Sequence, residues 1–376
     1  MTGGPLSHLK VLDLSRVLAG PWATQFLGDL GAEVIKIERP GAGDDTRAWG
    51  PPWFEGGVSA YFTCANRNKR SLAVDFTTPE GAARIRELAT EADVVVENFK
   101  KGALARYGLD YPSLKAVKPD LVYCSITGFG QTGPYAERAG YDALIQGMGG
   151  LMSITGEPDG EPMKVGVAVV DLFTGMYAAS GILAALAHRD RTGEGQQIDV
   201  ALFDVQAAML ANQGANYLAT GKAPKRLGNA HPSICPYQAF EAADGYLILA
   251  IGNDEQFAKF CRVAGHPELA KKTEFATNPA RVANRERLVP LLSELFLSRL
   301  RAWWIEELEA AGVPCGPIND LADVFSDPQL LSRGMVLERD GLRMVANPLK
   351  FSGTPLEAGS SPPALGTHSG GWRKDF

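Results

Sequence analysis

Short apolar segments alternate with amphipathic ones along the first third of the chain. Two apolar runs with strand character, Lys10–Leu14 and Glu33–Glu38, are separated by a predicted helix from about residue 21 to residue 30. Pro21 suits the first turn of that helix, and Gly31 suits its end. Strands that alternate with helices in this way predict an α/β protein with a parallel sheet covered by helices.

The same alternation continues for about two hundred residues. The further predicted elements are a helix opened by Thr78-Pro79-Glu80 that runs to about Ala92, strands at Asp93–Glu97, Leu121–Ile126 and Gln197–Leu202, and a helix at Asp204–Leu218. This beginning is Rossmann-like. However, the loop after the first strand, residues 15–21, contains neither GxGxxG nor GxxxxGK[ST], which disfavours a dinucleotide or ATP site.

The composition of the sequence changes at residues 219–232, which are polar and contain several Gly and Pro residues. This segment is the linker candidate. Beyond it, a strand at Tyr246–Ile251 and two or three helices through Ala311 predict a smaller mixed α/β domain.

Asp171 is the only fully charged side chain between Lys164 and Arg189. The β-branched run Val165–Val170 predicts a buried strand, and the Ala-, Leu- and Met-rich segment from Leu172 onward predicts a helix, so Asp171 falls at their junction. There the free N–H groups and the dipole of the helix would keep the carboxylate ionised. An ordinary N-cap is the simpler interpretation. A membrane span is disfavoured, because Asp171 and two glycines interrupt the stretch.

Composition narrows the class of protein. A chain of 376 residues with 45% hydrophobic and 21% charged residues is typical of a soluble protein of one large or two moderate domains. The net charge of −6 argues against general binding to nucleic acid or anionic membranes. Five cysteines without a CxxC pair favour reduced thiols over a zinc site or disulfides. The N-terminal residues lack the pattern of a signal peptide, which predicts a cytoplasmic protein.

Polar and basic residues cluster in two segments, Arg39–Arg47 and Asn66–Ser71. Arg and Lys near the ends of strands suit phosphate groups, although a solvated charged surface is the simpler interpretation of these residues alone. Asn98-Phe99 follows a predicted strand directly, where open α/β sheets bind ligands, and Arg106 comes soon after. Histidine is scarce and shows no metal-binding spacing. Only His231 lies in a loop rich in groups that contact ligands, and a purely structural role suits it as well.

Long blocks of this sequence resemble a known protein family. The blocks LKVLDLSRVLAGPWATQFLGDLGAEVIKIERPGAGDDTR, SAYFTCANRNKRSLAVDF, VVENFKKGALARYGL, SITGFGQTGPYAERAGYDALIQGMGGLMSITG and KVGVAVVDLFTGMYAASGILAAL closely resemble the class III CoA-transferases, the CaiB/BaiF family of formyl-CoA transferase and carnitine CoA-transferase. The blocks LGNAHPSICPYQAFEAADGYLILAIGNDEQF and GVPCGPIND are more similar to the branch that moves CoA between dicarboxylates, such as glutarate and itaconate.

The resemblance implies that Asp171 is the nucleophile, which attacks an acyl-CoA thioester to form a mixed anhydride and then an aspartyl-CoA thioester. Succinyl-CoA is the expected donor. Coenzyme A enters as substrate, and neither a metal nor a permanently bound cofactor is implied. The positions that match residues holding the nucleotide, phosphates and pantetheine of CoA are Arg39, Lys69, Leu72, Asn98, Phe99, Arg106 and Tyr141.

Two departures from other branches guide the expected substrate. The racemase branch has histidine where this chain has Tyr141, so the two-base proton shuttle of an acyl-CoA racemase lacks one partner. Formyl-CoA transferase has histidine and glutamine in place of Arg16 and Leu18, which makes oxalate and formate doubtful substrates. We therefore expect Arg16, Arg67 and His231 to pair with the distal carboxylate of a longer diacid. A racemase or a non-catalytic CoA-binding protein remains the alternative.

The architecture implied by the resemblance has a Rossmann-like large domain of residues 1–200 completed by 330–376, a linker of 201–225 and a small domain of 226–329. Two such chains would form an interlocked homodimer. The ending SGGWRKDF departs from the family, which puts the last contacts of the chain in doubt.

Overall fold

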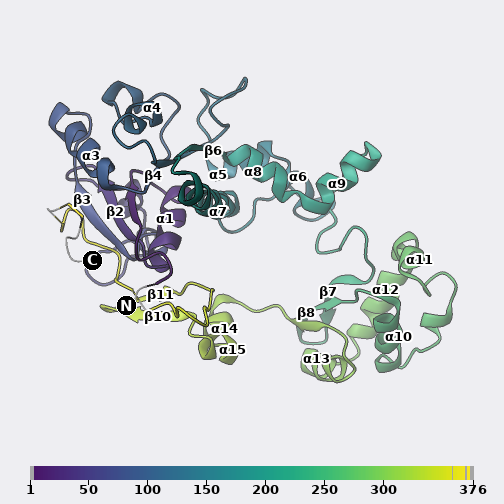
Figure 1. Cartoon of the computed structure of the whole chain (residues 1–376). Coiled ribbons are helices and arrows are strands. Elements are labelled where there is room, and N and C mark those ends of the chain that lie inside the picture. Colours follow the sequence, from purple (N-terminus) through teal and green to yellow (C-terminus); the bar gives the residue numbers. More distant parts are fainter. Residues whose placement is uncertain (1–3, 358, 369–370, 373–376) are drawn as a thin grey trace. The chain divides into compact units, whose positions relative to one another are not determined.

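The computed structural model describes residues 4–357, 359–368 and 371–372. The chain forms two compact units. The first comprises the chain up to Leu151, Lys164–Gly221, and the part from Pro328 onward, and the second comprises Met152–Met163 and Lys222–Asp327. Each unit is described by itself below (Figure 1).

The first unit is built on a six-stranded sheet whose strands all run parallel in the order β3-β2-β1-β4-β5-β6. The strands are β1 (Lys10–Asp13), β2 (Glu33–Glu38), β3 (Lys69–Ala73), β4 (Val94–Glu97), β5 (Val122–Thr127) and β6 (Gln197–Ala201). This order is that of the doubly wound Rossmann sheet, in which the strand order reverses between β1 and β4. The predicted α/β class with a Rossmann-like parallel sheet is confirmed.

Side chains of successive strand residues enter two different cores, as the two-residue period of a strand requires. Val94 and Val96 face one core together with residues of α1 and α7, whereas Val95 faces the other with residues of α3 and α4. The helices of the first unit are α1 (Ala19–Asp29), α2 (Ala60–Cys64), α3 (Pro79–Glu91), α4 (Tyr111–Lys115), α5 (Asp142–Met148), α7 (Val169–Thr192), α8 (Leu202–Met209), α9 (Ala211–Thr220) and α15 (Pro328–Ser332), with 3₁₀ turns η1 (Asp45–Ala48) and η2 (Ala105–Tyr107).

The structure differs from the sequence prediction in three places. Residues 165–168 form no strand, and Val169 already belongs to α7; Val167 is 56% exposed, so the β-branched run has no sheet to enter. Strand β3 was not predicted, because its polar KRSLA sequence reads as a loop and it is an edge strand paired only with β2. The helix predicted at Asp204–Leu218, within the predicted linker 201–225, is two helices, α8 and α9, which are separated where Ala211 adopts a φ of 43°.

The second unit is a three-stranded antiparallel sheet, ordered β7-β8-β9, packed against helices. Its strands are β7 (Tyr237–Ala242), β8 (Gly245–Ala250) and β9 (Cys315–Pro317), and its helices are α10 (Asp254–Val263), α11 (Asn278–Ala283), α12 (Arg285–Phe296), α13 (Arg301–Ala310) and α14 (Leu321–Ser326), with the 3₁₀ turn η3 (Leu269–Lys271). The short helix α6 (Leu151–Ile154) lies where the chain first passes into this unit. Stacked rings of Phe240, Phe260, Phe296 and Trp304 fill its core.

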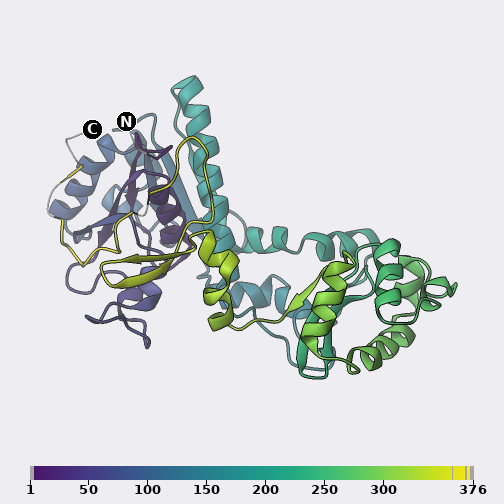
Figure 2. The ribbon, with the colours of Figure 1, turned by 90° about the horizontal axis from the view of Figure 1, so that it is seen from below.

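The chain returns to the first unit at Pro328 and there forms the hairpin of β10 (Val336–Arg339) and β11 (Leu342–Val345), which the C-terminal segment follows. This segment runs beside the edge strand β3, where His368 N–H donates to the Ser71 carbonyl at 3.2 Å (Figure 2, yellow segment). Trp372 is buried and its indole N–H donates to the Leu88 carbonyl at 3.0 Å. Of the predicted unusual ending, Gly371 and Trp372 are thus placed, and the rest lies outside the described residues.

Helix α7 is long and apolar enough to cross a membrane by length and composition alone, and 44% of its most apolar window is buried inside the protein. One such helix is weak support for a membrane protein. Val170, Ala178, Ile182 and Leu186 of α7 belong to the core on one face of the parallel sheet, which explains the apolar sequence as packing.

Candidate active site

Asp171 is the third residue of α7, and the helix starts without a capping side chain of its own, because its N-cap is Ala168. Asp142, the first residue of α5, takes that role: its Oδ1 accepts the backbone N–H groups of Val170 at 2.8 Å and Asp171 at 3.3 Å. The prediction that Asp171 itself accepts the free N–H groups of the helix is therefore wrong. The Asp171 carboxylate therefore does not serve as the cap of α7 and is available to react.

The environment of Asp171 favours the protonated carboxyl. Burial raises the pKa of Asp171, and the nearby carboxylate of Asp142 raises it further, to about 7. The expectation that the helix start keeps Asp171 fully ionised is thus corrected. Near neutral pH the two protonation states are comparably populated, which suits a group that must act as a nucleophile and later leave.

Asp171 lines a cavity of about 410 Å³ at the carboxyl ends of the strands. Of the predicted site residues, Arg16, Asn98, Phe99 and Tyr141 line the same cavity. Among the lining residues that sequence reasoning missed are the aromatic and basic side chains of Trp49, Lys100, Lys101 and Arg138. The two lysines follow Asn98-Phe99 directly, so their position in the chain offered a signal.

The loops after β1 and β4 are tied together beside this cavity. Arg16 N–H donates to Asn98 Oδ1 at 2.9 Å, and Asn98 Nδ2 donates to the Arg16 carbonyl at 2.6 Å. The guanidinium of Arg16 donates to Asp45 at 2.9 Å and lies 5.7 Å from the centre of the Phe99 ring. These loops meet where the strand order reverses, which is the position at which open α/β sheets bind ligands.

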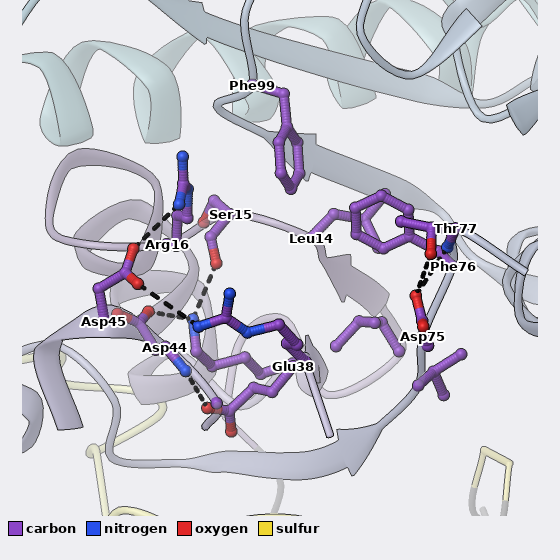
Figure 3. Close-up of a pocket in the computed structure, with 15 residues that line it drawn as sticks. Leu14, Ser15, Arg16, Glu38, Asp44, Asp45, Asp75, Phe76, Thr77 and Phe99 are labelled. Carbon is purple, nitrogen blue, oxygen red and sulfur yellow. Dashed lines mark hydrogen bonds and ion pairs between the residues drawn. The ribbon is translucent and has the colours of Figure 1, made fainter. Parts of the chain in front are cut away.

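A second, smaller pocket of about 170 Å³ adjoins the first, and the two share Arg16, Asp45 and Phe99 (Figure 3). Its walls combine a flat apolar side, to which Leu14 and Phe76 contribute, with a charged side. The predicted residue Arg39 lies on the charged side, with its guanidinium 4.0 Å from Asp45. An aromatic base and phosphate groups are the ligand parts that such walls suit.

Beneath this pocket lies a network of buried charges. Burial alone would raise the pKa of Asp13, but the ammonium groups of Lys69 and Lys36 hold it at about 2. Lys36 bonds the Ser15 carbonyl and Asp44, each at 2.8 Å, and Asp44 accepts the Val17 N–H, so the network anchors the loop that carries Arg16.

Two predicted CoA contacts lie in the interior. The ammonium of Lys69 is fully buried and donates to Asp13, to the Pro21 carbonyl and to Asn66 Oδ1 within 3.0 Å. Leu72 is 7% exposed and packs in the core. Neither lines a pocket with Arg16, because both side chains point from β3 into the protein. Arg106 is exposed, lies over the Tyr107 ring at 4.7 Å, and does not line either pocket.

The two other residues expected to hold an acceptor carboxylate are placed elsewhere. Arg67 is buried and bonds both carboxylate oxygens of Asp29 and the Val345 carbonyl, and it lines a different cavity, formed with the C-terminal segment. His231 belongs to the second unit, where its Nδ1 accepts the Ser233 N–H at 3.1 Å and its ring lies beside Tyr237. Only Arg16 of the three lines the Asp171 cavity. Among residues 4–357, 359–368 and 371–372, no group of three or more His, Cys, Asp or Glu side chains is placed to hold a metal ion.

Comparison with known proteins shows the family to which this chain belongs. The model of "CoA-transferase family III" matches residues 6–369. A succinate--glutarate CoA-transferase of Agrobacterium fabrum is 53% identical over 97% of this chain and 94% of its own length, and a human succinyl-CoA:glutarate CoA-transferase is 48% identical over 97% and 84%. A crystal structure of a CAIB/BAIF family protein from Brucella suis, 57% identical, covers 97% of each chain with a TM-score of 0.88. The chain therefore belongs to CoA-transferase family III and is a CoA-transferase.

Proposed function

We propose that this enzyme transfers CoA from succinyl-CoA to glutarate or a similar dicarboxylate, with Asp171 as the nucleophile. The observation that carries the proposal is the Asp171 carboxyl on the wall of a cavity that also presents cationic side chains to a ligand. The relatives at 48–53% identity bear the names of succinate–glutarate transferases.

The reaction needs only a carboxylate that can attack a thioester and later leave from an anhydride. The Asp171 carboxylate attacks the thioester carbonyl of succinyl-CoA, which forms a mixed anhydride and releases CoA thiolate. The thiolate attacks the aspartyl carbonyl, which frees succinate and leaves an aspartyl-CoA thioester. Glutarate attacks that thioester, and the released thiolate attacks the glutaryl carbonyl of the new anhydride. Glutaryl-CoA forms and the Asp171 carboxylate returns, so no proton, metal or permanently bound cofactor is consumed.

The two adjoining pockets suggest how CoA lies. The nucleotide would occupy the smaller pocket between Phe76 and Arg39, and the pantetheine arm would pass Phe99 toward Asp171 and Tyr141. Lys69 and Leu72 would act from the interior by fixing β3, and Arg106 remains an exposed candidate for a phosphate contact.

The cations of the Asp171 cavity support a diacid substrate. Arg16 and Arg138 offer guanidinium forks, and Lys100 and Lys101 offer point charges for the distal carboxylate. A racemase would need a second base opposite Asp171. No histidine is among the described residues that line the cavity, and Tyr141 stands where racemases carry theirs.

A homodimer is also proposed. Phe173, Met176 and Tyr177 of α7 are 37–52% exposed, and Tyr141 beside the cavity is 67% exposed. Apolar side chains gathered on one helix face are typical of a surface that a partner covers. Light scattering of the purified enzyme tests this: a monomer mass at micromolar concentration would exclude it.

The test of the reaction is isotopic. Enzyme incubated with succinyl-CoA and glutarate carrying ¹⁸O in its carboxylates should acquire ¹⁸O on Asp171, because the aspartate leaves with the oxygen that bridged the second anhydride. Asp171→Asn should lower transfer at least about a thousandfold. The matched control is Asp190→Asn, an exposed carboxylate on the same helix, which should behave as the wild type. Label on no residue, despite transfer, would rule out the aspartyl route.

A further inference from the structure

We propose that Asp142 is a positioning residue for the nucleophile: with Gln146 it fixes the first turn of α7, and it places a negative charge beside the Asp171 carboxyl. The inference rests on Asp171 being the nucleophile of the proposed reaction. It concerns a pair of side chains, Asp142 and Gln146, that does not line the cavity.

The side chains of Gln146 and Asp142 link the backbone N–H groups of the α7 region through a continuous chain of hydrogen bonds. Gln146 Nε2 donates to Asp142 Oδ2 at 2.6 Å, while Gln146 Oε1 accepts the Val165 N–H at 2.9 Å. Asp142 Oδ1 accepts the N–H groups at the start of α7. One helix, α5, therefore holds both ends of the segment that leads into the nucleophile.

The direction of this chain requires a carboxylate at position 142. Each hydrogen-bonding neighbour of the Asp142 side chain is a donor: two backbone N–H groups on one oxygen and the Gln146 amide on the other. Gln146 cannot turn its oxygen toward residue 142, because that oxygen already accepts the Val165 N–H and the side chain is fully buried. A neutral amide at 142 would leave one of these donors unpaired.

The same carboxylate acts on Asp171 through its charge. The charged or titratable groups on the cavity wall are Arg16, Asp45, Lys100, Lys101, Arg138 and Tyr141, and Tyr61 of α2 also feels the charge of Asp171. Burial and Asp142 are the two causes that raise the pKa of Asp171. The cations on the wall leave this balance in favour of the proton; burial contributes most to the raised pKa, and the charge of Asp142 adds to it.

Two effects on catalysis follow. A carboxylate with a raised pKa is a stronger nucleophile once ionised, and it is a poorer leaving group from the mixed anhydride. Ionisation also requires a higher pH, so the rate should rise with pH through a limb near 7. Both effects should weaken together when the charge at 142 is removed.

The experiment compares Asp142→Asn with the double variant Asp142→Asn/Gln146→Glu. The single variant removes the negative charge and leaves the Gln146 amide N–H without its acceptor. In the double variant, the carboxylate introduced at position 146 accepts the Val165 N–H and an N–H of the amide introduced at position 142. Every hydrogen bond is then restored while the negative charge moves one hydrogen bond further from α7. Asp190→Asn serves again as the exposed control on α7.

The pKa of Asp171 is read without substrate, from the infrared carboxyl band that is present in each protein and absent in the same protein carrying Asp171→Asn. Asp142→Asn should lower the pKa by about one unit, and the acidic limb of kcat/KM should move with it. The double variant should regain thermal stability and keep part of the lowered pKa. A pKa and pH limb unchanged in Asp142→Asn would overturn the proposal, leaving Asp142 a helix cap only. Transfer that is absent in the wild type while Asp171 titrates near 7 would instead count against the proposed substrates.

Discussion

Two buried carboxylates of the first unit meet opposite neighbours. Asp13, at the end of β1, is enclosed by the ammonium groups of Lys69 and Lys36, and its pKa falls to about 2. Asp171, in the first turn of α7, faces another carboxylate, and its pKa rises to about 7. Burial pushes both pKa values upward, so the difference comes from the neighbouring charges. The first carboxylate is a permanent anion that anchors a loop, and the second can exchange its proton near neutral pH.

The largest effect on stability is expected when Asp13, the carboxylate that pairs with a buried lysine, is replaced. Asp13→Asn would leave the buried Lys69 ammonium without its ion-pair partner and should lower the free energy of unfolding by about 3 to 5 kcal/mol at pH 7. Because the folded-state pKa is depressed, this loss should shrink as pH falls from about 4 toward 2. Denaturant unfolding at several pH values measures it.

The control for that prediction is an exposed ion pair. Lys10 and Glu91 lie 2.9 Å apart with both side chains partly in solvent, so Lys10→Met should cost less than about 1 kcal/mol. Equal losses in the two variants would mean that the buried network contributes no more than a surface pair.

The second effect has the opposite sign. Asp171 has a folded-state pKa above its ordinary value, so the folded protein loses stability as pH rises from about 4 to 7, where the unfolded chain is already ionised. Asp171→Asn removes this penalty and should stabilise the protein by up to about 4 kcal/mol above pH 7, with no gain below pH 4. Thermal unfolding across this pH range checks the gain, and a variant less stable than wild type at pH 8 would contradict it.

The smallest effect concerns a third, more exposed carboxylate. Asp45 pairs with Arg16 and lies near Arg39, at the join between the two pockets. Asp45→Asn should change stability by less than about 0.5 kcal/mol. It should lower the KM for succinyl-CoA about threefold, because it removes repulsion of the incoming phosphates. Steady-state kinetics at low and high salt test this, since the gain should fade as salt screens the charges. A raised KM at both salt concentrations would instead make Asp45 a ligand-holding group.

The elements that sequence predicted well carry strong local signals. Glu33–Glu38 is a strand with the predicted bounds, and Thr78 caps α3 as the Thr-Pro-Glu triplet indicated. The run Val165–Val170 misled because β-branched residues favour strands only where a sheet is available to pair with. Strand β3 escaped notice because its pairing with β2 is a long-range contact that its own polar sequence does not announce.

The candidate site was predicted in the same uneven way. Asp171 stood out as a lone charge in an apolar stretch, and Asn98 and Phe99 stood out by following a strand. Asp142 was missed because its importance depends on α5 meeting α7, whose capped N–H group at Val170 lies 28 positions further along the chain. Arg67 was misplaced because local sequence cannot distinguish a guanidinium aimed at substrate from one that binds Asp29 inside the protein.

The route of the C-terminal segment has a consequence for how the protein is made. The edge strand β3 is synthesised early, but the segment that lies along it, including His368, follows 297 positions after Ser71. Residues 222–327 of the second unit are all available before that segment appears. The nascent first unit must therefore wait with an open sheet edge until that segment has been made, and a chain truncated before it would expose an edge that invites aggregation.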